Sequence, residues 1–476
     1  MTDRVLPEVS ATALDGPTYV FTGPASASCR VTGIARDTVR VRVTTAPHEE
    51  WERAVAVTEP PLAAEVRTDA ATVRLAWGVL ALEVSLAPFW LRWSSRGRPL
   101  TSDHPYLAYT RRDGWIRHTM TRALQDVYFG LGEVSGDLNH HHRRYRLEPT
   151  DACGYNAEWS DPLYKHWPLY LTRTPHGSYF ALLYDVPCRM VVDFGAEIHH
   201  YYGPFRYAEM QAGGLEYYLI GADTLPALVG RITDLIGRPG LPPRWSLGYL
   251  HSGMAYADDA DPEAALVGFA ERCRAESLPC DGIQLGSGYT LRDGKRYVFH
   301  WNRDRIPDPG RFVEQLTSRR LHVVANIKPA LLTDHPDYER LAEQGGFVRD
   351  AAGGSVREGF WDGDASWPDF TQPAVRAWWK AGVTSQLLAH GIEGVWNDNN
   401  EYAVGDAFTA DGAPAHAAVQ MRLMAQASYE ALREWAPEAR PFLISRSASI
   451  GTQRYAQTWS GDNSTSWRTV RYNLPM

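Results

Sequence analysis

The first half of the chain alternates apolar and polar residues with the period of two that is typical of β-strands. Segments 37–45, 72–86, 178–186 and 214–221 follow this pattern and are rich in Val, Tyr and Leu. Gly, Pro, Asn and Asp separate them, and no long helical pattern comes between. We therefore expect residues 1–222 to form a large antiparallel β-sandwich.

The pattern changes near residue 223, where an amphipathic helix is predicted from about Thr224 to Ile236. The Pro- and Gly-rich stretch GRPGLPPRW then forms a linker that ends at residue 245. From 246 to 476, short apolar runs alternate with helical stretches, which indicates repeated βα units and a parallel sheet. We expect a (β/α)8 barrel rather than an open sheet, because polar and aromatic residues gather where these runs end. The predicted strands are WSLGYL, CDGIQL, LHVVANI, IEGVWND, PFLISR and YAQTWSG.

Only six such strands can be counted before the sequence ends, whereas a closed barrel has eight. We therefore expect the chain to stop inside the barrel after about six strands. Unpaired strands at the end of a sheet are a liability, so the sequence is interpreted as a fragment of a longer protein.

Two carboxylates follow apolar strands in this second half. Asp398 ends the run IEGVWND, and Asp462 follows the run YAQTWSG. In a parallel barrel, side chains at the carboxyl ends of strands point into one shared mouth, so both are candidates for catalysis. An N-cap or a loop turn would explain either one alone, and Glu401 is a rival candidate on composition alone.

Paired carboxylates next to tryptophans suit the cleavage of a glycosidic bond. One ionised carboxylate faces the positive charge that develops at the anomeric carbon, while a protonated one reaches the departing oxygen. An anion about 4 Å from that charge, at an effective dielectric near 20, is worth roughly 4 kcal/mol. That energy corresponds to about a thousandfold in rate.

Composition narrows the remaining possibilities. The net charge is −8 and no Lys/Arg cluster stands out, which argues against a nucleic acid or an anionic membrane as a partner. We expect no membrane span, no secretory signal and, from five scattered cysteines without a C-x-x-C motif, a cytoplasmic location. The run NHHHRRYR at 139–146 is interpreted as a loop rather than a metal site. No cofactor is predicted, and a homo-oligomer is left open.

Several longer motifs resemble those of glycoside hydrolase family 31, the α-glucosidase and α-xylosidase family. GVWNDNNEY is similar to the family's W-N-D-M-N-E signature, and RSASIGTQRYAQTWSGDNSTSW is similar to its acid/base segment. The resemblance extends from about residue 128 to the end of the chain, in the family's order. Further matches are YFGLGE, TDACGYNAEWSDPLYKHWPLYL, PPRWSLGY and WPDFTQPAVRAWW.

The resemblance implies a role for individual residues. Asp398 matches the nucleophile and Asp462 the general acid/base. Arg454 matches an arginine that binds the sugar in the cleavage subsite, and Asp151 matches a residue that leans over the barrel mouth from the sandwich. The other residues expected to bind or orient the substrate are Trp361, Trp396, Trp459, Glu401, Asn399, Lys328 and Tyr289.

The sequence departs from the family pattern after CDGIQL. Family members usually carry D-I-D-Y or D-I-D-W there, whereas this chain has Gly286 and Gly288 within LGSGYT. A site that binds hydroxyl groups rejects the wrong epimer by large factors, so the accepted sugar is expected to change. Asn399 and Lys328 also make the pocket more polar than usual.

These observations predict a retaining exo-α-glycoside hydrolase of α-glucosidase type that acts on an α-glycoside or oligosaccharide. Three alternatives stay open. They are α-galactosidase or α-N-acetylgalactosaminidase specificity, α-transglycosylation, and a carbohydrate-binding protein without catalysis.

Overall fold

A computed structural model describes residues 3–45 and 60–476 of the chain. Contacts between residues divide it into two compact units. The first comprises Met1–Arg238 together with Asp462–Met476, and the second comprises Pro239–Gly461. The domain boundaries at 222 and 245 that we derived from the sequence remain predictions.

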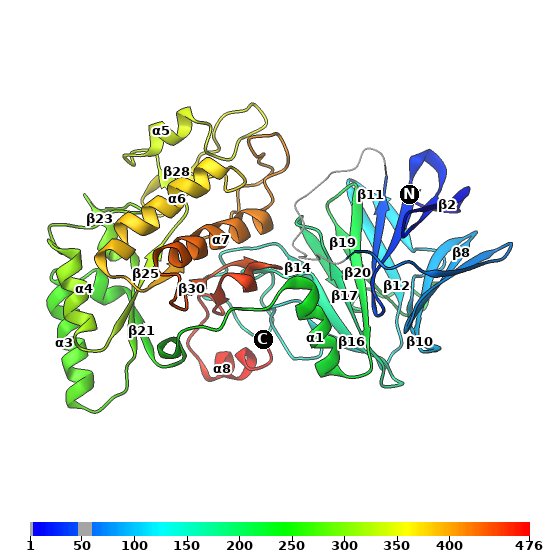
Figure 1. Cartoon of the computed structure of the whole chain (residues 1–476), viewed down its shortest axis with the longest axis horizontal. Coiled ribbons are helices and arrows are strands. Elements are labelled where there is room, and N and C mark those ends of the chain that lie inside the picture. The colour runs from blue at the N-terminus through cyan, green and yellow to red at the C-terminus, as the bar shows by residue number, and fades with distance from the viewer. Residues whose placement is uncertain (1–2, 46–59) are drawn as a thin grey trace. The chain divides into compact units, whose positions relative to one another are not determined.

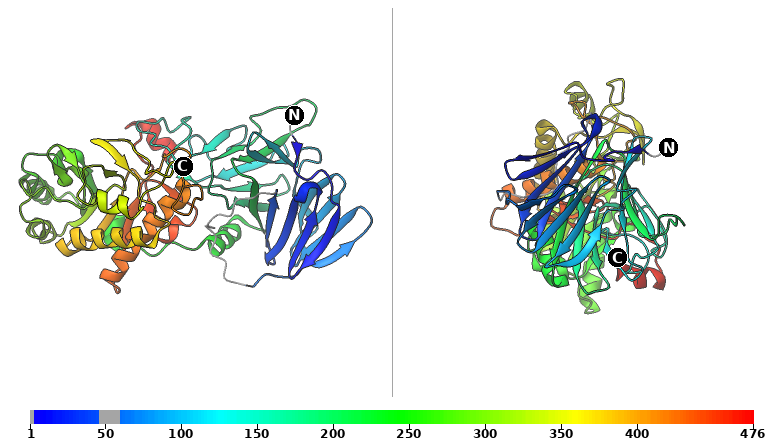
Figure 2. Two further views of the ribbon diagram at one scale, coloured as in Figure 1. Left: turned by 90° about the horizontal axis from the view of Figure 1, so that it is seen from above. Right: turned by 90° about the vertical axis from the view of Figure 1, so that its right-hand side faces the viewer.

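Within its described residues, the first unit is built from three antiparallel sheets, whose strands, coloured blue to green, run side by side in Figures 1 and 2. The alternation seen in the sequence is the cause, since one face of each strand supplies the buried residues. In strand order, the six-stranded sheet holds β1 (Asp3–Arg4), β11 (Tyr109–Arg112), β12 (Trp115–Thr121), β19 (Phe205–Met210), β18 (Met190–Asp193) and β14 (Arg144–Leu147).

The five-stranded and eight-stranded sheets complete the β-structure of this unit. The former holds β10 (Arg98–Ser102), β9 (Phe89–Ser95), β8 (Leu80–Leu86), β7 (Thr72–Trp77) and β6 (Glu65–Thr68). The latter holds β13 (Val127–Gly130), β16 (Leu169–Arg173), β17 (Tyr179–Tyr184), β20 (Gly214–Ala222), β5 (Thr38–Thr44), β4 (Ser28–Ala35), β3 (Thr18–Thr22) and β2 (Ala11–Asp15).

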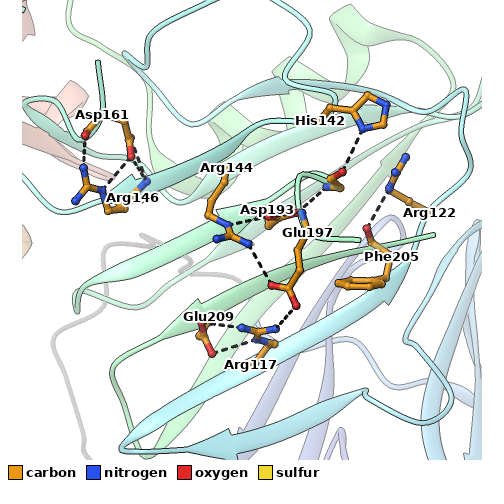
Figure 3. Close-up of polar contacts among 11 residues, drawn as sticks. Arg117, Arg122, His142, Arg144, Arg146, Asp161, Asp193, Glu197, Phe205 and Glu209 are labelled. Atoms are coloured by element: carbon orange, nitrogen blue, oxygen red, sulfur yellow. Dashed lines mark hydrogen bonds and ion pairs between the residues drawn. The ribbon is translucent and has the colours of Figure 1, made fainter. Parts of the chain in front are cut away.

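A row of alternating charges crosses the outer face of the six-stranded sheet (Figure 3). Glu209 pairs with Arg117 at 3.1 Å, and Arg117 reaches Glu197 at 3.5 Å. Arg144 then joins Glu197 at 3.1 Å to the buried Asp193 at 2.9 Å. These cross-strand pairs satisfy charges on β12, β14, β18 and β19 and help to fix the strand register.

The described residues of the first unit include two α-helices. Thr224 caps α1 (Leu225–Ile236) by accepting a hydrogen bond from the Ala227 amide, and this helix covers the region predicted from the sequence. Near the C-terminus, Ser466 caps α8 (Trp467–Asn473) in the same way. Tyr472 of α8 packs into a small apolar cluster with Tyr155, Ala157, Leu163 and Tyr164.

The second unit is centred on one six-stranded sheet in which every pairing is parallel. Its strand order follows the sequence, as repeated βα units require. Five of the six predicted strands coincide with observed ones; the exception is WSLGYL, which was wrong, because Arg244–Leu247 form a 3-10 helix. The strands are β21 (Leu250–Gly253), β22 (Gly282–Leu285), β25 (His322–Ile327), β29 (Gly394–Asn397), β30 (Phe442–Ser445) and β32 (Gln457–Thr458).

Helices alternate with these strands. Asp261 and Asp308 each cap a helix that begins with proline, which is a helix-start signal readable from the sequence. Helices α6 and α7 pack side by side (Figure 1). The helices are α2 (Met254–Ala257), α3 (Pro262–Ala275), α4 (Pro309–Thr317), α5 (Tyr338–Glu343), α6 (Pro373–Gln386) and α7 (Ala417–Trp435).

Two small antiparallel elements extend from the loops of the second unit. The hairpin β23 (Leu291–Arg292) and β24 (Lys295–Arg296) follows β22, and a three-stranded sheet joins β26 (Leu331–Leu332), β28 (Gly363–Ser366) and β27 (Glu358–Phe360). Within the part of the chain that is described, none of the helices combines the length and the apolar character needed to cross a membrane.

Candidate active site

The candidate site begins where β29 ends. This strand lies between β25 and β30, and the Asp398 amide donates to the Ile327 carbonyl at 2.9 Å, so the chain stays in register as it leaves the sheet. Behind it, the Trp379 indole of α6 donates to Ser428 of α7 at 2.8 Å, and Ser428 donates to the Asn397 side chain at 3.1 Å. Side chains of α6 and α7 therefore fix the position of the end of β29.

Asp398 is 8% exposed and is surrounded by hydrogen-bond donors. Its Oδ2 accepts from the Asn326 amide at 3.0 Å and from the Lys328 ammonium group. Its Oδ1 lies 3.4 Å from Nε of Arg446. Asn326 and Lys328 come from the end of β25 and Arg446 from the end of β30, so both neighbouring strands contribute.

These neighbours decide the protonation state of Asp398. Burial raises the pKa of the carboxyl, but the positive charges of Lys328 and Arg446 and the hydrogen bonds from Asn326 and Lys328 outweigh it. The pKa of Asp398 therefore lies below its ordinary value, and the side chain is an anion at neutral pH. Burial in turn lowers the pKa of Lys328, against the opposing effect of Asp398.

Glu401 is occupied by a different partner. Arg446 binds its carboxylate with two parallel hydrogen bonds, at 2.9 and 2.8 Å, and Ser447 donates to it at 2.7 Å. Bidentate geometry of this kind is strong and directional. Glu401 thus orients Arg446, and the supporting role in the site that we expect for Glu401 stays a prediction.

Arg446 and Asn326 were not singled out in the sequence. Both stand at or directly after the end of a predicted strand, in PFLISR and LHVVANI, as Asp398 does. Applying the strand-end rule to every strand would have included them. Asn400 is also structural, since it bonds Ser445 at 2.9 Å and the Ser447 amide at 3.0 Å and so joins the β29 and β30 loops.

Trp361 stands beside Lys328. The Lys328 ammonium lies 4.6 Å from the centre of the indole, and the Arg296 guanidinium lies 5.4 Å from it. A small pocket of about 20 Å³, room for about one water molecule, opens next to these three side chains. Polar groups that line it include Ser287, Thr290, Asn326 and Asp362.

The remaining aromatic candidates of the second unit are placed differently. Trp396 and Trp459 meet edge to face with ring centres 5.7 Å apart, so the structure brings these two together. Arg454 lies between these two tryptophans in the chain, with its guanidinium 5.6 Å from the ring of Tyr455. Tyr289 is 1% exposed and donates to the Asn326 carbonyl at 2.8 Å, which places it beneath the site as a support for β25.

Asn399, the next candidate, follows Asp398 in the chain and is 4% exposed. Its side-chain oxygen accepts a hydrogen bond from Lys328, so Lys328 joins two consecutive residues of the β29 loop. Its backbone φ is +47°, in the left-handed region that asparagine adopts more often than most other residues except glycine.

Asp462 and Asp151 belong to the first unit, where the structure brings them close together. The Asp462 amide donates to the Tyr164 hydroxyl at 3.3 Å, and that hydroxyl donates to Asp151 at 3.2 Å. The Gly154 amide donates to the Asp462 carbonyl at 2.6 Å. These bonds connect the two segments in which the sequence predicted site residues.

The two glycines that depart from the family pattern are tightly enclosed. A Cβ at Gly288 would lie 2.1 Å from Asp258 Oδ1 and 2.6 Å from the Ala257 carbonyl, so no carboxylate side chain fits there with this backbone. At Gly286 a Cβ would approach Met254 Sδ to 3.1 Å. The Asp258 carboxylate, paired with Arg296 at 3.4 Å, occupies the space instead.

In residues 3–45 and 60–476, no group of three or more His, Cys, Asp and Glu side chains is arranged to hold a metal ion. The adjacent histidines at 140–142 each bond a different backbone carbonyl, those of Gly130, Asp126 and Gly195. They act as loop supports.

Two family profiles match the sequence. The profile described as "Glycosyl hydrolases family 31 TIM-barrel domain" matches residues 239–476. The profile "Glycosyl hydrolase 31 N-terminal galactose mutarotase-like domain" matches residues 28–193.

Curated relatives are similar over most of this chain. Alpha-glucosidase 2 of Bacillus thermoamyloliquefaciens is 30% identical over 74% of the chain and 45% of its own length. Neutral alpha-glucosidase AB of Sus scrofa is 33% identical over 70% of the chain and 38% of its own length. The chain thus spans less than half of either relative.

Solved structures share the fold. A family 31 dextranase from Flavobacterium johnsoniae, complexed with isomaltotriose, matches with a TM-score of 0.87 and 23% identity, over 99% of this chain and 59% of the other. A glucosidase II alpha subunit matches with a TM-score of 0.87 and 17% identity, over 100% of this chain and 61% of the other.

Proposed function

Because this chain belongs to glycoside hydrolase family 31, we propose that it acts as a retaining, exo-acting α-glycoside hydrolase, with Asp398 as nucleophile and Asp462 as general acid/base. One observation carries the proposal. Asp398 is a buried anion at the carboxyl end of a central parallel strand, with hydrogen bonds from Asn326 and Lys328 at the end of β25 and the positive charge of Arg446 at the end of β30. In enzymes with this type of barrel, catalytic groups occupy that position.

The reaction proceeds in two displacements. A carboxylate oxygen of Asp398 attacks the anomeric carbon, the glycosidic C–O bond breaks, and its electron pair takes the proton of the Asp462 carboxyl group. The product is a β-linked glycosyl-enzyme. Asp462, now a carboxylate, then removes a proton from water, whose oxygen displaces Asp398 and releases the α-sugar.

The charges around Asp398 suit the first displacement. A nucleophile must be ionised before substrate binds, and Lys328 and Arg446 keep the pKa of this carboxyl low despite its burial. Arg446 is already paired with Glu401, so the local charges of these four residues sum to zero. When a neutral sugar covers these four residues, it therefore buries no net charge.

An α-glucoside is the first substrate to test, because curated relatives are named alpha-glucosidases. A galactose-type or N-acetylgalactosamine-type sugar is the second. It is favoured by Gly286 and Gly288, which stand where family members usually carry carboxylates.

A panel of nitrophenyl α-glycosides (glucoside, galactoside, xyloside and N-acetylgalactosaminide) tests the proposal on the full chain. Turnover of at least one of them is expected. Glycosyl transfer to added sugar at high substrate concentration would indicate a transglycosylase instead. Sugar binding measured by calorimetry with no turnover of any substrate would indicate a binding protein and refute the proposed hydrolase.

We expect Asp462→Asn to separate substrates by their leaving groups. General acid catalysis is worth about 10²–10⁴-fold, so natural disaccharides should lose at least about a hundredfold in kcat/KM. Nitrophenyl glycosides need less protonation and should lose less in the first step.

The matched control is Asp293→Asn, whose side chain is 88% exposed in a hairpin turn. It should behave like the unmodified chain with both substrate types. Equal losses for good and poor leaving groups in Asp462→Asn would argue against its role as the acid.

A further inference from the structure

The two oxygens of the Asp398 carboxylate have different surroundings. Oδ2 accepts hydrogen bonds from both Lys328 and Asn326. Among the described residues, the only charged group recorded near Oδ1 is Arg446, whose Nε is 3.4 Å away, too far for a good hydrogen bond. The carboxylate is therefore anchored through one oxygen and leaves the other available.

Resting on the proposed function, we propose that Lys328 is a positioning residue that anchors Oδ2, so that Oδ1 is the oxygen that attacks the anomeric carbon. An oxygen with two strong donors has its lone pairs occupied, and it reacts only after losing one of them. Oδ1 does not have to lose a strong hydrogen bond before it reacts. The first bond of the reaction then forms between Oδ1 and carbon while Oδ2 remains on Lys328.

Lys328 is itself held on three sides. Its ammonium bonds Asp398 and the side-chain oxygen of Asn399 and lies over the face of Trp361. Both Asn399 and Trp361 have positive backbone φ angles, +47° and +30°. A positive φ is strained for a bulky residue such as Trp361, whereas asparagine tolerates it. The contacts with Asp398, Asn399 and Trp361 together fix the position of Lys328.

The charged groups that face Asp398 come from three strand ends. Lys328 follows β25, Glu401 lies in the loop after β29, and Arg446 follows β30. Arg446 is engaged in its bidentate pair with Glu401, so Lys328 is the cation dedicated to Asp398. Consistent with this, Lys328 is the leading charge that lowers the pKa of Asp398 against the effect of burial.

A positioning lysine and a substrate-binding lysine predict different kinetics. If Lys328 contributed only by binding a sugar hydroxyl, its removal would raise KM and leave the single-turnover rate of glycosyl-enzyme formation nearly unchanged. If it anchors Oδ2, its removal raises the pKa of Asp398 and loosens the carboxylate. Activity then requires a higher pH, since Asp398 must be ionised, and the acid limb of the kcat/KM profile moves upward.

We expect Lys328→Met to move the acid limb upward by about one pH unit, the low end of the effect of a close charge. The single-turnover rate of glycosyl-enzyme formation should fall about a hundredfold, as for a nucleophile misplaced by about 1 Å. Lys328→Arg keeps the positive charge, so the acid limb of its kcat/KM profile should lie close to that of the unmodified chain.

The matched control is Arg296→Met. Arg296 lies against the same Trp361 ring and pairs with Asp258 and Asp362. No contact between it and Asp398 is recorded in the described residues, so the acid limb should stay where it is.

A raised KM with an unmoved acid limb in Lys328→Met would overturn the proposal. A second measurement does not depend on turnover: the titration of Asp398, read by infrared difference spectroscopy against Asp398→Asn. The proposal requires this titration to shift upward in Lys328→Met. An unshifted titration overturns it even if every variant and the unmodified chain are inactive, in which case the proposed hydrolase function fails separately.

Discussion

Replacing Asp398 by Asn is expected to lower kcat/KM for aryl α-glycosides by about a thousandfold or more. The variant keeps the shape of the side chain but removes the anion that faces the developing positive charge. At about 4 Å and an effective dielectric near 20 this interaction is worth roughly 4 kcal/mol, or about three orders of magnitude in rate. An amide also cannot form the covalent intermediate, so the residual rate should be that of direct attack by water.

Chemical rescue makes the test specific. In Asp398→Gly the space of the carboxylate becomes open, and azide at high concentration should restore bond cleavage and give a β-glycosyl azide. The exposed Asp304 provides a control, Asp304→Asn, that should retain full activity. A rate close to that of the unmodified chain in Asp398→Asn would remove Asp398 from the mechanism.

The second large effect is on stability. Arg446→Met should lower the free energy of unfolding by about 3–5 kcal/mol, the usual cost of removing one partner of a buried ion pair. The Arg446 side chain is 3% exposed and is bonded twice to Glu401, whose side chain is 6% exposed. Without it, Glu401 and Asp398 would share the single positive charge of Lys328. Urea denaturation followed by circular dichroism measures the difference.

Removing the partner as well identifies the cause. In Arg446→Met combined with Glu401→Gln, part of the lost stability should return, because the buried anion is gone. Arg272→Met, which breaks an exposed pair with Glu276 on α3, should leave the unfolding transition almost unchanged. Equal stability of the double and single variants would contradict a charge-based origin.

Much of the second unit could be predicted because its signals are local. Apolar runs of four to six residues formed β22, β25, β29 and β30, and Asp-Pro pairs started α3 and α4. The N-terminal half was recognisable only as β-rich. Its division into three sheets depends on pairings such as β5 with β20, in which Ile220 meets Thr38. No pattern within either strand specifies a partner so distant in the sequence.

The candidate site was predictable in position but not in connectivity. The strand-end rule predicted Asp398, Asn399 and Glu401 at one edge of the sheet, whereas Lys328 was expected in the pocket from the comparison with the family pattern. It could not tell which cation would bind which carboxylate. That outcome depends on how far each side chain reaches. Arg446 donates hydrogen bonds to Glu401, whereas Lys328 donates to both Asp398 and Asn399.

Tyr289 shows the opposite limitation. Tyr289, in LGSGYT, is among the residues that the family resemblance led us to expect at the substrate. The chain turns there into the 3-10 helix Ser287–Thr290, and its ring packs 4.6 Å from Trp301 in the interior. A turn of one residue reverses the direction of a side chain, and strand periodicity does not extend into it.

The most direct test of the nucleophile is to trap the intermediate. The full chain is incubated with an activated fluorosugar that forms the glycosyl-enzyme faster than water can release it, then digested and analysed by mass spectrometry. Asp398 as nucleophile predicts one added sugar on the peptide that contains residues 392–400, attached at Asp398, with activity lost in proportion. An adduct on Glu401 or another carboxylate, or continued hydrolysis with first release of the β-sugar and no adduct at all, would contradict it.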